Sequence, residues 1–222
     1  MSGKAVLFDM DGVIFDSERA VLACWQEVGA RFSLRGIEQV FVRCVGVNKQ
    51  RTRQIFLEAY PELDFDRFDE AVRARFLSRY DKGRLPLKPG VREILAALKE
   101  AGIPLALASS TRLVTVRREL DEAGLLPCFD AVIGGDTVAH SKPDPEIFLT
   151  AAALLDAAPT DCWVIEDSFN GIRAAHAGGM HPIMVPDLLP PDTEMAEKAE
   201  VIVKDLWEAK SYLERKIEEE RL

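Results

Sequence analysis

The chain has 222 residues, of which 48% are hydrophobic, and its 37 acidic residues outnumber 28 basic ones to give a formal net charge of −9. This length suits one large domain or a core with a smaller companion, and the negative charge argues against nucleic acid and anionic membranes as partners. The four cysteines have no Cys-x-x-Cys spacing and no apolar run approaches the roughly 20 residues of a membrane span, so we expect a cytoplasmic protein with reduced thiols.

The first predicted element is a buried strand over residues 5–8 (AVLF), which is followed at once by the sequence DMDG. This places Asp9 and Asp11 one residue apart at the end of the strand. Asp-x-Asp-Gly can form a simple turn, because Asp bonds its own backbone and Gly adopts positive φ. The alternative is that the two carboxylates carry chemistry, and position alone leaves both interpretations open.

No strand pattern occurs from about residue 17 to residue 81. Residues 18–32, 50–60 and 67–80 instead show the spacing of amphipathic helices. We interpret residues 17–83 as an inserted α-helical cap domain, with its return linker in the Gly/Pro-marked stretch 81–90. Residues 1–16 and 84–222 would then form the core domain.

After the insertion, short apolar strands alternate with helices, which indicates an α/β fold with a doubly wound parallel sheet. Expected helices cover residues 91–102, 114–124 and 145–155, and a charged, solvated helix ends the chain at 207–222. The further strands are expected at residues 103–108, 131–134, 162–165, 181–185 and 201–203.

Polar residues follow several of these strands, at the edge where ligands bind in open parallel sheets. They are Asp9 and Asp11, then Ser109, Ser110 and Thr111, then Lys142, and finally Glu166, Asp167 and Ser168. Each group has a structural explanation as well: the hydroxyls, Asp144 and Ser168 could cap helices. Turns and caps do not, however, explain why so many acids, hydroxyls and one lysine fall at the same edge.

Four carboxylates at one edge repel one another unless a cation lies among them, and oxygen ligands without His or Cys favour Mg²⁺. With Lys142 and the hydroxyls of Ser109 and Ser110, the same groups could bind a phosphate. A carboxylate with its ordinary pKa is ionised at neutral pH, so Asp9 could attack phosphorus and form an aspartyl-phosphate. Asp11 could then protonate the leaving oxygen and later take a proton from the attacking water.

The segments DMDGV, LALASST, SKPDPEIF and VIEDSFNGIRAA resemble the four ordered motifs of the haloacid dehalogenase-like superfamily, in the branch that includes β-phosphoglucomutase. The resemblance covers nearly the whole chain and implies a helical cap on an α/β core. It implies Asp9 as nucleophile, Asp11 as acid/base, Ser109 and Lys142 as phosphate ligands, and Asp167 as acidic Mg²⁺ ligand. Asp9 and the main-chain oxygen of Asp11 would complete the protein's metal shell, with Glu166 bound directly or through water.

The cap offers weaker signals. Residues 45–50 (VGVNKQ) resemble the cap loop that reaches over the active site in this branch, so Lys49 is a candidate substrate contact, as is Arg112 at the rim. Known β-phosphoglucomutases carry a histidine on the first cap helix where this chain has Val21, although Arg19 is close enough in sequence to substitute.

We therefore expect a monomeric, cytoplasmic, Mg²⁺-dependent phosphatase of a small phosphorylated metabolite, such as a sugar phosphate monoester. The first alternative is a sugar-phosphate mutase. The second is a non-catalytic protein that binds phosphorylated metabolites.

Overall fold

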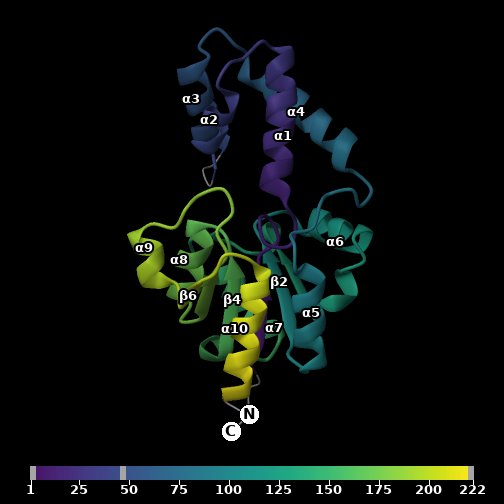
Figure 1. Ribbon diagram of the computed structural model, residues 1–222, viewed down its shortest axis with the longest axis vertical. Helices are drawn as coiled ribbons and strands as arrows, with labels where there is room; N and C mark the ends of the chain where they lie inside the picture. The colour runs from purple at the N-terminus through teal and green to yellow at the C-terminus, as the bar shows by residue number, and fades with distance from the viewer. Residues whose placement is uncertain (1–3, 46–48, 220–222) are drawn as a thin grey trace. The chain divides into compact units, whose positions relative to one another are not determined.

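A computed structural model describes residues 4–45 and 49–219 (Figure 1). The chain divides into two compact units, one of residues 1–15 and 87–222 and the other of residues 16–86. The second unit begins one residue before, and ends three residues after, the helical insertion expected at 17–83. We refer to the two units as the core and the cap.

The core is built on a six-stranded sheet in which every neighbouring pair is parallel, in the order β3-β2-β1-β4-β5-β6. This confirms the predicted doubly wound α/β fold, and no strand end differs from its predicted position by more than two residues. The strands are β1 (Ala5–Phe8), β2 (Leu105–Ser109), β3 (Ala131–Gly134), β4 (Cys162–Glu166), β5 (His181–Met184) and β6 (Val201–Ile202).

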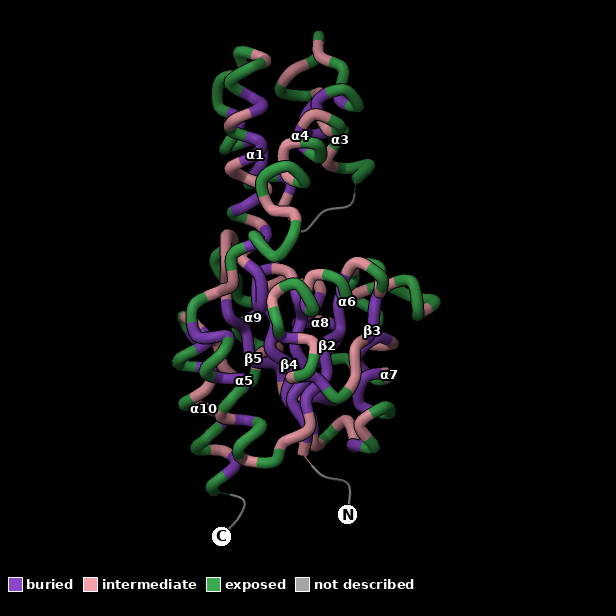
Figure 2. Tube along the Cα trace, turned by 90° about the vertical axis from the view of Figure 1, so that its right-hand side faces the viewer, coloured by how far each residue is buried: buried purple, intermediate pink, exposed green. Residues whose placement is uncertain are grey.

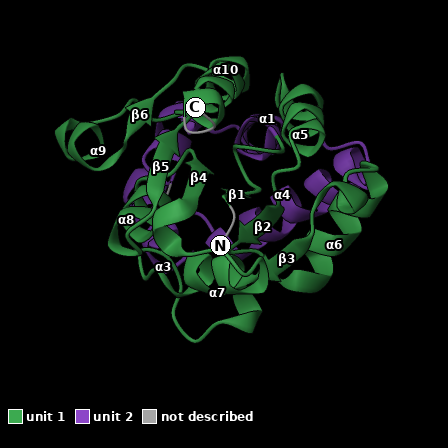
Figure 3. Cartoon of the chain, turned by 90° about the horizontal axis from the view of Figure 1, so that it is seen from below, with its two compact units in different colours: residues 1–15, 87–222 green, residues 16–86 purple. Residues whose placement is uncertain are grey.

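Helices cover both faces of this sheet. They are α5 (Val91–Glu100), α6 (Leu113–Glu122), α7 (Glu146–Leu154), α8 (Phe169–Ala177), α9 (Thr193–Lys198) and α10 (Leu206–Glu219). Seen along the strands, α5 and α10 lie on one side of the sheet and α7 on the other (Figure 3). Strands covered on both faces need apolar side chains throughout, and β1, β2 and β4 are buried along their whole length (Figure 2).

Alternation along the strands divides their side chains between two apolar layers. Ala5 and Leu7 of β1 belong to a cluster with α7 and α8. Their neighbours Val6 and Phe8 are also fully buried, and because successive strand residues point to opposite faces they fill the other layer. The hydrophobic effect therefore fixes the central strands, and the positions of the residues that follow them.

The described residues of the cap form four helices, α1 (Ser17–Arg31), α2 (Ile37–Val42), α3 (Lys49–Ala59) and α4 (Phe65–Tyr80). Its core is aromatic: the ring of Trp25 lies 5.1 Å from that of Phe68 and 5.2 Å from that of Phe41, all edge-on. Phe56 completes this cluster at 4.6 Å from Phe68. Edge-to-face packing of this kind gives a small helical unit a specific core.

The cap helix α2 and the core helix α9 were not predicted, because each is only six residues long and shows too few turns for a helical period. Residues 46–48 of the expected cap loop lie outside the described residues. Within the part of the chain that is described, no helix is both long and apolar enough to cross a membrane.

Candidate active site

The parallel register brings the predicted site residues to one edge of the core sheet. Phe8 of β1 is paired with Leu107 of β2 on one side and with Ile165 of β4 on the other. The next residue, Asp9, therefore stands level with the carboxyl ends of both neighbouring strands. This is the position at which ligands bind in open α/β sheets.

The segment after β1 is a tight loop in which the N–H groups of Ile14 and Phe15 both donate to the carbonyl of Met10, at 2.9 and 3.0 Å. Gly12 has φ +80°, a left-handed conformation that favours glycine. A Cβ at Gly12 would also lie 2.1 Å from Oδ2 of Asp167. Glycine is therefore required here for two reasons, its backbone conformation and the lack of space for a side chain. Because Gly12 has no Cβ, the carboxylate of Asp167 can lie against the loop that carries Asp9 and Asp11.

Lys142 is the central cation of the site. Its Nζ donates to Oδ1 of Asp9 at 2.5 Å, to Oε1 of Glu166 at 2.8 Å and to the carbonyl of Ala108 at 3.2 Å. The three charged side chains are almost fully buried, with exposures of 5% for Lys142, 10% for Asp9 and 1% for Glu166. The residue that follows β1, the last residue of β4 and a residue of the loop before α7 thus form one buried ionic cluster.

This environment changes the acid–base properties of the pair. Burial raises the pKa of Asp9 from its ordinary 3.8 to about 7, because the opposing effect of Lys142 is smaller and the charges of Glu166 and Asp11 act against it. Burial alone would lower the pKa of Lys142, but Asp9 and Glu166 outweigh burial and raise that pKa. Lys142 therefore stays protonated. Asp9, in contrast, needs more positive charge than Lys142 provides to be fully ionised at neutral pH.

Both carboxylate oxygens of Glu166 have partners inside the core. Oε1 accepts from Lys142, while Oε2 accepts from the backbone N–H of Ser168 at 2.8 Å and from its hydroxyl at 2.9 Å. The hydroxyl of Ser168 in turn accepts from the N–H of Gly171, which caps α8. A Cβ at Gly171 would lie 1.7 Å from Oε1 of Glu166, so this glycine makes room for the carboxylate. Glu166 thus orients Lys142 in this structure, and its contact with a metal stays a prediction.

The hydroxyl residues after β2 are divided between two tasks. Ser109 is 1% exposed, and its hydroxyl accepts from the N–H of Thr111 at 3.0 Å. The hydroxyl of Thr111 donates to Oδ2 of Asp11 at 3.0 Å, a contact the sequence analysis did not assign. In the sequence, the signal for this contact was the run of three hydroxyl residues at the end of β2. None of the three caps α6, whose first N–H, that of Leu113, bonds to Asp136 at 2.7 Å.

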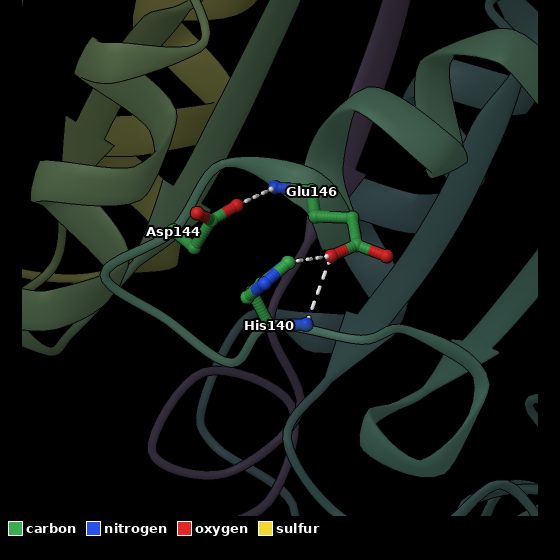
Figure 4. Close-up of side chains that lie close together, drawn as sticks. All are labelled: His140, Asp144 and Glu146. Atoms are coloured by element: carbon green, nitrogen blue, oxygen red, sulfur yellow. Dashed lines mark hydrogen bonds and ion pairs between the residues drawn. The ribbon is translucent and has the colours of Figure 1, made fainter.

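The loop that carries Lys142 is fixed by a hydrogen-bonded turn (Figure 4). The carboxylate of Glu146 accepts from the N–H groups of Ala139 and His140, both at 2.8 Å, and contacts the Nδ1 of His140 at 2.8 Å. Asp144 accepts from the N–H of Glu146 at 3.0 Å, but the N-cap of α7 is Pro145 and not Asp144 as the sequence suggested. The proximity of these three side chains is explained by the turn itself, because they bond one another and the backbone.

Two of the candidate substrate contacts form ion pairs of their own. Arg112 immediately precedes α6 and lies 3.7 Å from Asp136, with 78% of its side chain exposed. Lys49 begins α3 in the cap and pairs with Asp69 at 2.7 Å. Contacts of Arg112, Lys49 and the exposed Ser110 with a substrate stay predictions.

The core edge also has the chemistry that Mg²⁺ requires. Asp9, Asp11 and Asp167 offer oxygen donors, and the close approach of Gly12 and Asp167 brings the β1 and β4 segments together. Burial raises the pKa of Asp9 despite Lys142, so a second cation would favour its ionised form. A hard divalent cation bound by these three residues fits both observations.

Comparisons with known proteins agree with the fold and place the chain among hydrolases. The haloacid dehalogenase-like hydrolase family matches residues 4–179. The chain is 32% identical to hexitol phosphatase B of Escherichia coli, over 91% of this chain and 96% of that protein, and 31% identical to β-phosphoglucomutase of Bacillus subtilis, over 82% and 83%. It spans only 53% of the bifunctional riboflavin kinase/FMN phosphatase of Arabidopsis thaliana, to which it is 29% identical over 91% of its own length. A crystal structure of a HAD family hydrolase from Deinococcus radiodurans, with bound phosphate and sodium, superposes with a TM-score of 0.82 at 26% identity, covering 96% of this chain and 95% of that one.

Proposed function

The chain belongs to the haloacid dehalogenase-like hydrolase family, and we propose that it is a Mg²⁺-dependent phosphatase of a small phosphorylated carbohydrate. Its relatives include a hexitol phosphatase and a β-phosphoglucomutase. The observation that carries this proposal is the buried cluster in which Lys142 bonds Asp9 and Glu166. A buried ammonium beside a carboxylate suits a site that must hold a phosphate dianion against a negatively charged nucleophile.

The proposed first step is attack on the phosphorus by a carboxylate oxygen of Asp9. A bond forms between that oxygen and phosphorus while the bond to the leaving sugar oxygen breaks, and Asp11 donates its proton to that oxygen. Lys142 offsets the repulsion between carboxylate and phosphate, and Ser109 and Ser110 bind the phosphoryl oxygens. When bound to Asp9, Asp11 and Asp167, Mg²⁺ would add charge neutralisation at the same phosphate.

The second step reuses the same groups. Water attacks the phosphorus of the aspartyl-phosphate, Asp11 accepts a proton from that water, and the bond from Asp9 to phosphorus breaks. The products are inorganic phosphate and the original carboxylate. The hydrogen bond from Thr111 to Asp11 supports this assignment, because it fixes the orientation of the group that must first donate and then accept a proton.

The second candidate function is a sugar-phosphate mutase. It is supported by the B. subtilis relative, but the position at which known β-phosphoglucomutases carry a histidine is Val21, on α1. Valine neither donates a hydrogen bond nor titrates. We therefore favour hydrolysis. The non-catalytic alternative is weaker still, because binding alone needs neither Asp9 nor Asp11 as reacting groups.

The proposal is tested by measuring phosphate release from a panel of phosphorylated sugars, polyols and nucleotides, with Mg²⁺ and after thorough chelation. We expect turnover of one or more sugar or polyol phosphates that disappears on chelation and returns with Mg²⁺. Activity unchanged by chelation would contradict the metal assignment. Tight binding without any turnover would favour the non-catalytic alternative.

A further inference from the structure

A buried ion pair lies at the core edge, outside the four sequence motifs. Nζ of Lys88 lies 2.7 Å from Oδ1 of Asp187, and only 15% and 2% of these side chains are exposed. The two residues are 99 positions apart in sequence. Lys88 precedes α5, and Asp187 follows β5.

Lys88 also connects this pair to the loop after β1. Its backbone N–H donates to the carbonyl of Ile14 at 2.9 Å, in the loop after β1 that contains Gly12. One residue therefore holds the Asp9–Asp11 loop through its backbone and the segment after β5 through its side chain. Because β1 and β5 lie on either side of β4, the pair spans the strand that ends in Glu166 and is followed by Asp167.

The pair is close to Asp167 itself. A carboxylate oxygen of Asp187 and one of Asp167 lie within 4.8 Å of each other. Two carboxylates at this separation attract a cation together, whereas the ammonium of Lys88 repels one. The charge of each partner thus acts on a cation bound by Asp167, and the two effects have opposite signs.

We propose that Lys88 and Asp187 are positioning residues that tune the affinity of Asp167 for its divalent cation, Asp187 strengthening it and Lys88 weakening it. This inference rests on the proposed function, in which Asp167 is a Mg²⁺ ligand. The two opposite charges hold the Asp167 side of the site in place. Because the pair is neutral overall, it adds no net charge that would bind the cation too tightly or repel the substrate phosphate.

A purely structural ion pair would behave differently. Removing either partner of a buried pair leaves the other charge uncompensated and destabilises the fold in both cases. Stability alone cannot therefore separate the two roles. The sign of the change in cation affinity can, because only an electrostatic role predicts opposite shifts for the two single variants.

The test uses Lys88→Gln, Asp187→Asn and the double variant, since both replacements can keep a hydrogen bond between the side chains. Mg²⁺ dissociation constants are measured without substrate, from amide shifts in ¹H–¹⁵N NMR spectra. Lys210→Gln and Glu214→Gln are matched controls, because this pair, 2.6 Å apart, lies on α10. Lys88→Met replaces Lys88→Gln if the latter does not fold.

We expect Lys88→Gln to tighten Mg²⁺ binding and Asp187→Asn to weaken it, each by about tenfold, as expected for one unit charge several ångströms from a divalent ion. The double variant should return to within about threefold of the wild type, and the controls should not change. Shifts of the same sign in both single variants, or shifts below about twofold, would overturn the inference. Failure of the wild-type protein to bind Mg²⁺ or to hydrolyse any phosphate ester would instead overturn the proposed function, on which this inference rests.

Discussion

At the scale of single residues, burial controls the charge of the proposed nucleophile, Asp9. It raises the pKa of this carboxyl from 3.8 to about 7. The carboxylate is therefore only partly ionised in the metal-free protein near neutral pH. Positive charge from Lys142 and from a bound cation is then part of making Asp9 reactive, because each favours the ionised form.

The first prediction concerns Lys142. Replacing Lys142 with Ala should lower kcat/KM by about 100-fold or more, the order of effect expected for one preorganised electrostatic group. It should also destabilise the fold, because Asp9 and Glu166 would stay buried without their cation. Steady-state kinetics and urea unfolding measure the two effects.

The matched control is Lys99→Ala, which removes a lysine that bonds the carbonyl of Pro127 at 2.8 Å. It should leave kcat/KM unchanged. A loss below about tenfold in Lys142→Ala would show that the residue merely helps to start α7, because tenfold corresponds to only about 1.4 kcal/mol of transition-state stabilisation.

The second prediction concerns Gly12. In Gly12→Ala the new Cβ would lie 2.1 Å from Oδ2 of Asp167, so the carboxylate must move. We expect weaker Mg²⁺ binding and lower kcat/KM, in addition to the cost of about 1–2 kcal/mol for a left-handed alanine. Calorimetric or NMR titration with Mg²⁺, together with thermal unfolding, measures these effects.

Gly124→Ala separates the two causes, because Gly124 also has a left-handed φ, +68°, but a Cβ there meets nothing within 4 Å. It should lose a similar amount of stability and keep its Mg²⁺ affinity. If Gly12→Ala bound Mg²⁺ as tightly as Gly124→Ala does, Asp167 would not depend on this close approach.

Sequence reasoning found the acids and Lys142 because each follows a strand or lies in a recognisable motif. It did not find the contact of Thr111 with Asp11, nor Asp187. Both depend on which side chains the folded edge brings together across a hundred or so residues, and a single sequence carries no direct signal for such pairs. The raised pKa of Asp9 could not be predicted from the sequence either, because it depends on how deeply the folded core buries the carboxyl.

At the scale of elements, the strands were predictable because their apolar runs are continuous and a sheet covered on both faces requires that pattern. The longer helices other than α8 were found through their period, whereas α8 was expected only as a helix that Ser168 could cap. The short helices α2 and α9 were missed, since six residues complete fewer than two turns.

The third prediction concerns Glu200, which connects β5 and α10. Its carboxylate accepts from the hydroxyl of Tyr212 and contacts the ring of His181. Burial alone would raise the pKa of Glu200, but the hydrogen bonds of Tyr212 and His181 outweigh burial and lower it below the ordinary 4.5. The unfolded chain then takes up this proton first as the pH falls. The stability that Glu200 contributes is therefore present above pH 4.5 and is lost below it.

Glu200→Gln should thus unfold more easily than the wild type at neutral pH, and this difference should shrink as the pH falls below 4.5. Urea unfolding at a series of pH values measures the difference, with Glu218→Gln on the exposed face of α10 as the control. A difference that stays constant with pH would show that Glu200 acts through packing and not through its charge.

At the scale of the whole molecule, the chain combines an α/β core that carries the candidate site with a helical cap. The family relationship supports an enzyme that acts on phosphate esters, and the relatives include both a phosphatase and a mutase. The choice between them depends on how long a phospho-aspartate is kept from water.

The fourth prediction separates these two activities. With Val21 in place of a histidine, we expect net hydrolysis: the protein incubated with β-glucose 1-phosphate and a glucose 1,6-bisphosphate primer should release inorganic phosphate or leave the sugar unchanged. Phosphorus NMR follows all the species in one sample, with a known β-phosphoglucomutase as the positive control. Efficient conversion to glucose 6-phosphate would identify the chain as a mutase.

The central claim is that Asp9 forms an aspartyl-phosphate, and chemical trapping tests it most directly. Turnover of the best substrate from the panel is quenched in acid, the protein is reduced with borohydride, which converts an acyl phosphate to homoserine, and its peptides are analysed by mass spectrometry. We predict homoserine at position 9 in the wild type with substrate and Mg²⁺. We predict none without substrate and none in Asp9→Asn, whose amide is a poor nucleophile and which should fold but not turn over. Near wild-type turnover by Asp9→Asn, or a trapped residue at another position, would contradict the claim.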